Sequence, residues 1–486
     1  MSTATVEGRL FEVGEAGTFA ERWERPAGEE KTFRPYDPDQ VLLMAPVLSE
    51  WVPEGDLAHF VSDLVEEALD LGPIYASYES ERGHPPYDPR LMLKLLIYGY
   101  ATGTCSSRKL EAATYRDVAV RMLCADQHPD YRSIARFRER HSEALADLFG
   151  ETLRLCSEAG LLKLGSLALD GTKLRANASR HKAMSYERME RAEAELAAKV
   201  STLLAEAADT DRAEDELYGR DRRGDELPDE LARRESRLKR IREAKATLEA
   251  EAREREQARR AEMAAEGRVP RRPPRGRDPF APKPAEQRNF TDPDSKIMKT
   301  SSGAFEQCYN GQAVVDSHAQ VIVASELSNL APDTSQLKGA LDQLRQNLTA
   351  IEAELPQGAT LSADAGYLSE DNIKTTSDRG LDPHIATGRH KHSDPPPISP
   401  RGRIPKDATP KQRMARKLKT KRGRTVYAKR KTIVEPVFGQ MQTVQGARQL
   451  LLRGEAKARA QWRFHCAVHN LLKLHRAGGL ALVAAA

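Results

Sequence analysis

Apolar and polar positions follow a helical period through the first third of the chain. Between Tyr36 and Leu162 apolar residues recur every three or four positions, as in LLMAPVLSEWV, LAHFVSDLVEEAL and LMLKLLIYGYA. This period predicts a compact all-α unit over residues 36–162. The preceding segment is polar and rich in glycine, which predicts a flexible N-terminal arm over residues 1–35.

Two short helices predicted within that unit have a basic face. SSRKLEAATYRDVAVRMLC and PDYRSIARFRERH are separated by DQHPD, and the second segment carries Arg132, Arg136, Arg138 and Arg140. A helix-turn-helix that places its second helix in a DNA groove has this pattern. A surface helix pair with a basic outer face has it too. The pattern alone leaves both interpretations open.

A long stretch with heptad spacing follows. From residue 184 to 266 the composition changes to Glu, Arg, Ala and Lys, and Met189, Leu196 and Leu203 fall seven positions apart. YGRDRRGDELPDE supplies the Gly and Pro for a reversal. We therefore expect an antiparallel helical hairpin with a thin apolar seam, followed by a Pro- and Arg-rich linker. Hairpin and linker together form an insertion over residues 184–284.

The rest of the chain alternates strand and helix patterns. CYNGQAVV and QVIVASE are apolar and β-branched, and DSHA between them predicts a β-hairpin. An amphipathic helix is predicted from Leu337 to Leu355. The segments around LALD and LSAD predict two short strands that end on Asp170 and Asp364, and PHIAT predicts one more.

This order predicts an α/β, multidomain protein. A strand, a long helical insertion and then alternating strands and helices indicate a mixed sheet with helices against it. The sheet domain is expected over residues 163–183 and 285–476, with a short C-terminal tail over 477–486.

Composition narrows the class of protein. The chain has 486 residues, a net charge of only +4 and five cysteines without CxxC spacing, so we expect several structural units, no zinc site and reduced thiols. No apolar run reaches the length of a membrane span, and the N-terminus lacks the order of a signal peptide. We expect a cytoplasmic protein.

Three carboxylates are candidates for metal binding. If the two strands are neighbours, Asp170 and Asp364 lie side by side, and two hard oxygen ligands suit Mg²⁺. A lone aspartate at a strand end is more often a turn residue, so LALDGTK by itself favours a turn. Glu435 lies between Val434 and Val437, where an unpaired carboxylate would be costly, and a metal would offset that cost.

Four motifs in order carry a resemblance to a known family. LALDGTK, YNGQAVVD, SADAGY and VEPVFGQ, followed by RG and HNLLKLH, resemble the DDE transposases of bacterial insertion sequences with a helical insertion after the first catalytic strand. The resemblance covers residues 37–476. It implies a ribonuclease-H-like, mixed-sheet catalytic domain interrupted by a helical-hairpin insertion, with Asp170, Asp364 and Glu435 as the catalytic and metal-binding triad. It also favours an all-α N-terminal DNA-binding unit with a helix-turn-helix.

The resemblance also implies an activity. Such a transposase binds double-stranded DNA at the terminal inverted repeats of its element, cleaves the strands and joins them to target DNA by two-metal phosphoryl transfer. The implied cofactor is Mg²⁺, for which Mn²⁺ can substitute, and the implied assembly is a homo-oligomer in a synaptic complex, with no membrane partner. The alternative is a catalytically inactive, domesticated DNA-binding protein with the same fold. An unrelated metal-dependent nuclease would not need the basic helical unit.

The C-terminal part supplies most of the expected DNA contacts. Residues 401–431 contain fourteen Lys or Arg and one acid, which favours phosphate binding, although such a run is often only a solvated loop. The expected DNA-binding residues are Arg132, Arg136, Arg138, Lys173, Arg430, Lys431, Arg448 and Arg453.

The text around Glu435 departs from the family pattern. Tyr427 is one position too far from Glu435, Lys431 stands where the family has Arg, and Gln442 stands where it has Lys. Pro436 predicts that a helix begins or kinks there.

Overall fold

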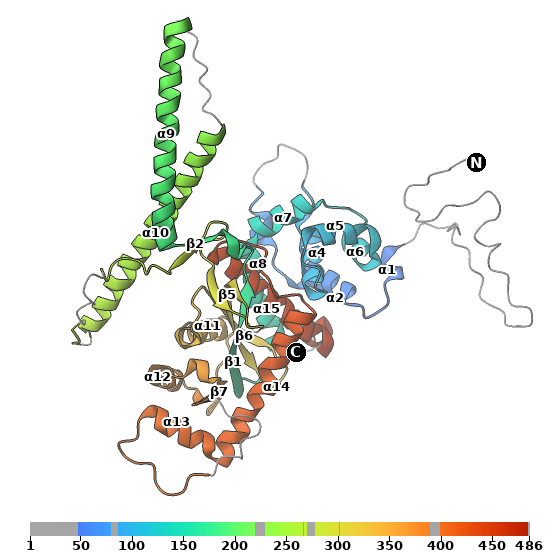
Figure 1. Ribbon diagram of the computed structural model, residues 1–486. Coiled ribbons are helices and arrows are strands. Elements are labelled where there is room, and N and C mark those ends of the chain that lie inside the picture. Colours follow the sequence, from blue (N-terminus) through green and yellow to red (C-terminus); the bar gives the residue numbers. More distant parts are fainter. Residues whose placement is uncertain are drawn as a thin grey trace, which may run out of the picture. The chain divides into compact units, whose positions relative to one another are not determined.

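The N-terminal part is all helical, as its apolar period predicts (Figure 1). The computed structural model describes residues 47–78, 86–218, 229–265, 267–269, 278–300, 302–388 and 399–484, so the predicted arm over 1–35 lies outside the described residues. The helices are α1 Leu48–Trp51, α2 Leu57–Asp63 with a π-helical continuation Leu64–Ala68, α3 Gly72–Tyr75, α4 Pro89–Ala101, α5 Ser107–Arg116, α6 Val118–Leu123, α7 Tyr131–Arg140 and α8 Ser142–Glu158.

The predicted helix pair is three helices. The carboxylate of Asp117 accepts hydrogen bonds from the backbone N–H groups of Ala119 and Val120, which caps α6 and ends α5 at Arg116. Asp130 caps α7 in the same way. An aspartate inside the first predicted helix therefore starts a new helix.

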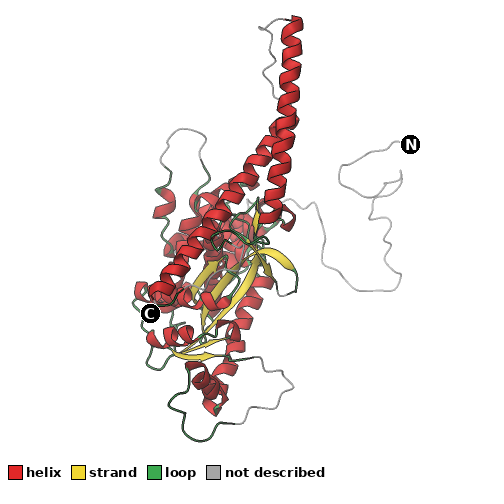
Figure 2. Ribbon diagram, turned by 60° about the vertical axis from the view of Figure 1, so that its left-hand side comes forward, coloured by secondary structure: helices red, strands yellow, loops and turns green. Residues whose placement is uncertain are grey.

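A six-stranded mixed sheet follows, and Figure 2 shows its strands in yellow. Its strands are β1 Ser166–Arg175, β4 Lys296–Lys299, β5 Phe305–Asp316, β6 Ile322–Ser328, β7 Thr360–Ala363 and β8 Asp382–Ile385. The order is β4-β5-β1-β7-β8, and β6 pairs with β5. β5 is antiparallel to β1, β4 and β6, whereas β7 lies between β1 and β8 and is parallel to both. The predicted β5–β6 hairpin and the predicted last strand are present.

The helices that flank the sheet are, in chain order, α11 Leu337–Ala350, α12 Glu370–Asp378, α13 Pro410–Lys419, α14 Lys421–Thr443, α15 Glu455–Ala477 and α16 Leu480–Ala484. Short 3-10 turns span Arg180–Lys182, Asp333–Ser335 and Ala365–Tyr367.

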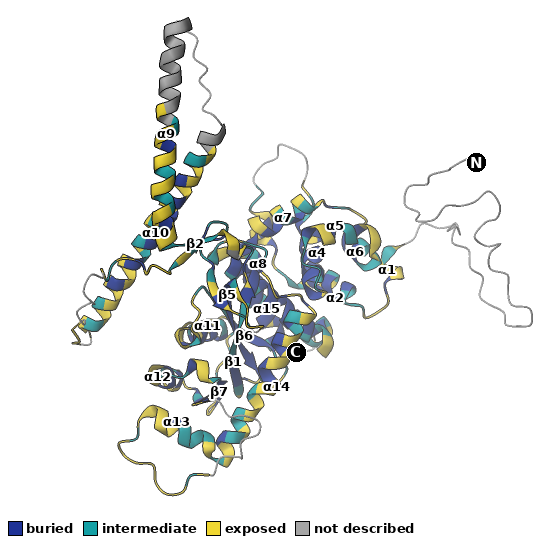
Figure 3. Cartoon of the chain, viewed as in Figure 1, coloured by how far each residue is buried: buried dark blue, intermediate teal, exposed yellow. Residues whose placement is uncertain are grey.

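Both faces of the sheet are buried, as the dark strands of Figure 3 show. Leu167 and Leu169 of β1 pack in one core with α8 and α11, and Ala168 and Leu174 pack in a second core with α14 and α15. Alternate residues of one strand thus serve opposite faces. The first core also contains the N-terminal helices, so the hydrophobic interior is continuous across the predicted boundary between residues 162 and 163.

The insertion is a helical hairpin, as predicted. β2 Ala183–Ser185 pairs with β3 Gln287–Asn289, and between them run α9 Tyr186–Tyr218 and α10 Asp229–Ala265. Met189 packs near Leu248 and Val200 packs near Leu238, so the two helices are antiparallel. None of the helices in the described part of the chain is both long and apolar enough to cross a membrane.

The sequence predicts that a helix begins or kinks at Pro436; helix α14 continues through it, so the first of these expectations is wrong. A proline has no N–H to donate to the carbonyl four residues earlier, here Thr432. Nε2 of Gln320, in the β5–β6 turn, donates to that carbonyl over 2.9 Å. His469 Nε2 and Lys473 Nζ of α15 in turn contact Gln320, so a tertiary donor replaces the missing helical one.

Candidate active site

The sheet places Asp170 next to Asp364. The last pair in the parallel ladder between β1 and β7 is Leu169 with Ala363, so the two aspartates occupy the next position on each strand. The expectation that β1 ends on Asp170 is wrong. The strand continues to Arg175 because β5 pairs with it on the other side, where Asp170 lies opposite Ala313.

Asp170 is held between a cation and a backbone donor. Its side chain is 24% exposed, Oδ2 accepts from Nη1 of Arg430 at 2.8 Å, and Oδ1 accepts from the N–H of Gly171 at 2.9 Å. Burial raises the pKa of Asp170 and Asp364 raises it further, whereas Arg430 lowers it, and the net shift is upward. The ionised carboxylate therefore depends on a nearby positive charge.

Asp364 caps the 3-10 turn Ala365–Tyr367. Its Oδ1 accepts from the N–H of Gly366 at 2.8 Å. Within the described residues its second oxygen has no hydrogen-bond partner. The chain reverses at this turn, so the carboxylate of Asp364 stays at the end of its strand while β1 runs past it.

Gly171 makes room for an amide on the opposite side of the strand from Asp170. A Cβ at this position would lie 2.3 Å from Nε2 of Gln312. That Nε2 donates to Oδ1 of Asn310 at 2.9 Å, and Oε1 of Gln312 accepts from the hydroxyl of Tyr367. The glycine after Asp170 is thus required by packing, and the buried hydroxyl of Tyr367 connects this amide to the turn that carries Asp364.

Asp333, which the sequence did not single out, is the centre of this polar network. Its Oδ1 accepts from Nζ of Lys173 at 3.0 Å and from Nδ2 of Asn310 at 2.9 Å. A Cβ on Gly366 would lie 3.3 Å from its Oδ2, so the carboxylate faces the turn that carries Asp364. In the sequence, the segment APDTS is typical of a helix start. Only its tertiary partners distinguish Asp333 from an ordinary capping residue.

Glu435 does not lie as expected. Its side chain is exposed, whereas Val434, Val437 and Phe438 are buried, because consecutive residues of a helix point about 100° apart. The expectation that apolar neighbours bury Glu435 is therefore wrong. Within the described residues, no three His, Cys, Asp or Glu side chains gather as a metal site, so Glu435 does not join the two aspartates in this arrangement.

Two neighbours on α14 do face the aspartates. Tyr427 precedes Arg430 by three positions, so both lie on one side of the helix. Burial raises the pKa of Tyr427, Arg430 lowers it, and Asp364 and Asp170 raise it. The irregular spacing to Glu435 therefore does not remove Tyr427 or Arg430 from the site.

Comparison with known families gives two matches, one at each end of the described chain. A transposase domain (DUF772) matches residues 46–140, and a transposase DDE domain matches residues 403–475. Together the two matches support an insertion-sequence DDE transposase. Searches of curated proteins and of solved structures gave no match.

Some candidate residues of the transposase lie within the two matched segments, and others lie outside them. The DDE match covers α13, α14 and α15, with Arg430 and Glu435, and the first match covers α7. Asp170 and Asp364 lie between the two. Transposition, a metal-dependent enzyme and a DNA partner follow at the level of the family.

The basic residues of the transposase fall into two groups. Arg138 is only 5% exposed, and its Nη1 donates to the carbonyl of Cys105 at 2.7 Å while Nη2 donates to Oγ of Ser107. It secures the chain before α5, so we withdraw it from the expected DNA contacts. Lys173 and Arg430 are likewise occupied by Asp333 and Asp170.

The other expected contacts are exposed. Arg132 and Arg136 lie on α7, and Lys431 lies on α14. Nε of Arg448 donates to the carbonyl of Gln442, and Nε of Arg453 donates to that of Asn177, which fixes the direction of both side chains.

The basic run is ordered as helix over much of its length. Thr409 and Gln412 form a reciprocal capping box at the start of α13, and Thr420 caps α14 directly after it. Lys417 forms an ion pair with Asp382 of β8. The run therefore rests against the sheet, and its other cations surround the start of α14.

Proposed function

We propose that this transposase binds the ends of its insertion sequence as a homo-oligomer and cleaves and joins DNA strands by metal-dependent phosphoryl transfer. The observation that carries the proposal is the parallel register that sets Asp170 beside Asp364. The sheet, in which β5 pairs antiparallel with β1, β4 and β6 while β7 and β8 continue it in parallel from β1, supports a ribonuclease-H-like catalytic domain.

The donor set suits a hard divalent cation. Carboxylate oxygens of Asp170 and Asp364 are ligands of the kind that Mg²⁺ and Mn²⁺ take. Burial disfavours the charge of Asp170, and a cation would stabilise it. When bound, such ions lower the pKa of the attacking water or 3′-hydroxyl and stabilise the leaving oxygen.

Glu435 is the proposed third ligand. It lies seven residues, or about two turns, before Gln442 and therefore on the same stripe of α14. Nε2 of Gln442 donates to Oγ1 of Thr172 at 2.9 Å, so this stripe adjoins β1 two residues beyond Asp170. We propose that the exposed Glu435 side chain turns toward β1 to complete the set.

The remaining groups orient Asp170 and hold the DNA. Arg430 and the N–H of Gly171 fix one oxygen each of Asp170. Exposed cations on α7, in the middle of α14 and in the loop after it hold the DNA phosphates, and we assign this role to Arg132, Arg136, Lys431, Arg448 and Arg453.

The test is strand cleavage of duplex DNA that carries the element's ends. We expect Asp170→Asn, Asp364→Asn and Glu435→Gln each to lose at least about 10³-fold in rate, roughly 4 kcal/mol, with binding of the ends retained. Glu370→Gln is the matched control, because Glu370 is an exposed acid of α12 close in sequence to Asp364. Full activity of either aspartate variant would contradict the proposal.

A second readout does not depend on activity. At a concentration of about one hundred times its Kd, Mg²⁺ or Mn²⁺ should stabilise the wild type by about 2.7 kcal/mol against unfolding. Asp170→Asn and Asp364→Asn should lose this stabilisation, and Glu370→Gln should keep it.

The exposed position of Glu435 favours one alternative, an inactive DNA-binding protein with the same fold. In that case the wild type binds the ends and never cuts them, with either cation.

A further inference from the structure

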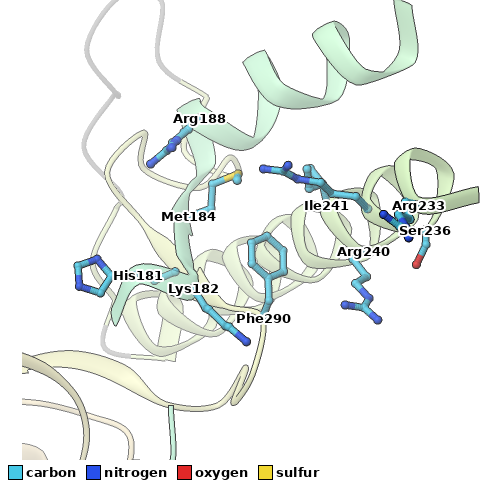
Figure 4. A pocket seen from close by; sticks show the side chains of 11 residues that line it. His181, Lys182, Met184, Arg188, Arg233, Ser236, Arg240, Ile241 and Phe290 are labelled. Carbon is cyan, nitrogen blue, oxygen red and sulfur yellow. The ribbon is translucent and has the colours of Figure 1, made fainter. Parts of the chain in front are cut away.

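A basic pocket lies at the base of the helical hairpin, where β2, β3, α9 and α10 meet (Figure 4). Its volume is about 700 Å³. We define the basic pocket by its lining residues, which are His181, Lys182, Ala183, Met184, Arg188, Arg233, Ser236, Arg237, Arg240, Ile241 and Phe290. This lining contains five Lys or Arg and no acid.

The cations of the basic pocket differ from several others on the hairpin that form ion pairs. Arg242 and Lys245 share Glu193, and Arg255 pairs with Glu286, so their charges are neutralised locally. Within the described residues, the exposed side chains of Lys182, Arg188, Arg237 and Arg240 form no ion pair. Positive charge therefore accumulates on this side of the hairpin.

The floor of the basic pocket is apolar and firmly packed. Ile241 is 1% exposed in a cluster with Met189 and Leu248, and Met184 and Phe290 pack against that cluster. Figure 4 shows Phe290 between Lys182 and Arg240. Exposed cations around an apolar floor suit the sugar-phosphate backbone of a nucleic acid, which presents phosphates beside apolar sugar faces.

The basic pocket is tied to the strand that carries Asp170. Nδ2 of Asn289 donates to the carbonyl of Ser179 at 2.8 Å, and the N–H of Phe290 donates to that of Lys182 at 3.0 Å. Lys182 follows Asp170 by twelve positions, so their Cα atoms lie within about 40 Å of each other. That distance corresponds to about twelve base pairs of duplex DNA.

We propose that the basic pocket binds the phosphate backbone of the element's DNA within about twelve base pairs of the cleavage site. This proposal rests on the proposed function and adds a second point of contact to it. Charge complementarity favours DNA over a protein partner, because the basic pocket offers several cations without local counter-ions and no hydrogen-bonding acid.

The test compares two triple variants of the full chain. Lys182→Glu/Arg237→Glu/Arg240→Glu reverses three charges of the basic pocket, and Lys199→Glu/Lys239→Glu/Arg253→Glu reverses three exposed charges elsewhere on α9 and α10. Binding of end DNA is measured from 50 to 200 mM salt. We expect the slope of log K against log salt to weaken by about 2 to 3 in the pocket variant and by less than about 1 in the control.

The length of the DNA sharpens the test. On a duplex that lacks the element's own DNA within about twelve base pairs of the cleavage site, the pocket variant and the wild type should have the same slope, and the difference should return when those base pairs are restored. Lys182→Gln/Arg237→Gln/Arg240→Gln, which removes charge without reversing it, should show the same difference with a smaller amplitude.

Three results would overturn the proposal. Equal slopes for the pocket variant and the control would show that the basic pocket does not bind DNA, while leaving the proposed function intact. A wild type that binds no end DNA would contradict both proposals. A pocket variant that keeps its DNA slope but loses binding of poly-glutamate would assign the basic pocket to an acidic protein partner.

Discussion

The acid edge, where Asp170 and Asp364 meet, and the basic pocket, whose first lining residues follow β1 in the chain, are built in opposite ways. At the acid edge each cation is matched to an acid, Arg430 to Asp170 and Lys173 to Asp333, and the groups are largely buried. In the basic pocket the cations are exposed on an apolar floor. The properties of the acid edge thus depend on the exact positions of its paired side chains, whereas those of the basic pocket depend on its accumulated positive charge alone.

The largest expected contrast is in stability. Asp333→Ala removes the acceptor of Lys173, Asn310 and Gln312 at once, so we expect a loss of about 3 kcal/mol in the free energy of unfolding, reduced from a fully buried case because Asp333 is partly exposed. Arg237→Ala should change it by less than about 0.5 kcal/mol. Urea unfolding measures both. Equal losses would show that the basic pocket is also a structural element.

The second contrast is in acid sensitivity. Burial lowers the pKa of His469 to about 3, below its ordinary value of 6.5. Below pH 6.5 the imidazole is therefore protonated in the unfolded chain but stays neutral in the folded chain. Stability that is present at neutral pH is lost as the pH falls below about 6.5, by about 1.4 kcal/mol per pH unit. His469→Gln should remove this component, which amounts to about 2 kcal/mol at pH 5.

Unfolding of wild type and His469→Gln at pH 7 and pH 5 measures the difference. The comparison at pH 7, where the imidazole is mostly neutral in both states, is the control for lost packing. His469 contacts the turn at Gln320, which in turn supports α14. If the free energy of unfolding falls by the same amount between pH 7 and pH 5 in both proteins, His469 on α15 does not contribute to the stability of the acid edge.

The smallest contrast concerns one methyl group. Gly171→Ala forces the amide of Gln312 to move, with an expected cost of about 1 to 2 kcal/mol. Gly165→Ala is the control, because no atom lies within 4 Å of the added carbon. If both variants unfold alike, Gln312 has room to adjust and does not fix the strand beside Asp170.

Periodicity predicted most elements correctly. The N-terminal helices, the hairpin α9–α10, the β5–β6 hairpin and the two strands that bring Asp170 to Asp364 all follow from local patterns, because each pattern is a property of the element itself. The break at Asp117 was missed, since a capping aspartate inside a helical period has no distinct signal of its own.

Features that depend on distant partners could not be predicted. Arg138 has the same local pattern as its exposed neighbours, and only distant acceptors, the carbonyl of Cys105 and Oγ of Ser107, make its burial favourable. Asp333 becomes central through Lys173 and Asn310, which lie on other strands. The direction of Glu435 depends on how α14 is rotated against the sheet, and apolar neighbours in sequence do not specify it.

The pairing of β2 with β3 has a consequence for the order of folding. Arg175 and Cys308, which pair in the sheet, are more than one hundred positions apart in the sequence. Most of that separation lies between Ser185 and Gln287, which pair with each other at the base of the hairpin. Once the hairpin has formed, only about twenty-five residues of loop remain to be closed, which reduces the entropic cost by about 1.5 kcal/mol. The tip of the hairpin can therefore vary in length between related elements without delaying or shifting the assembly of the strand that carries Asp170.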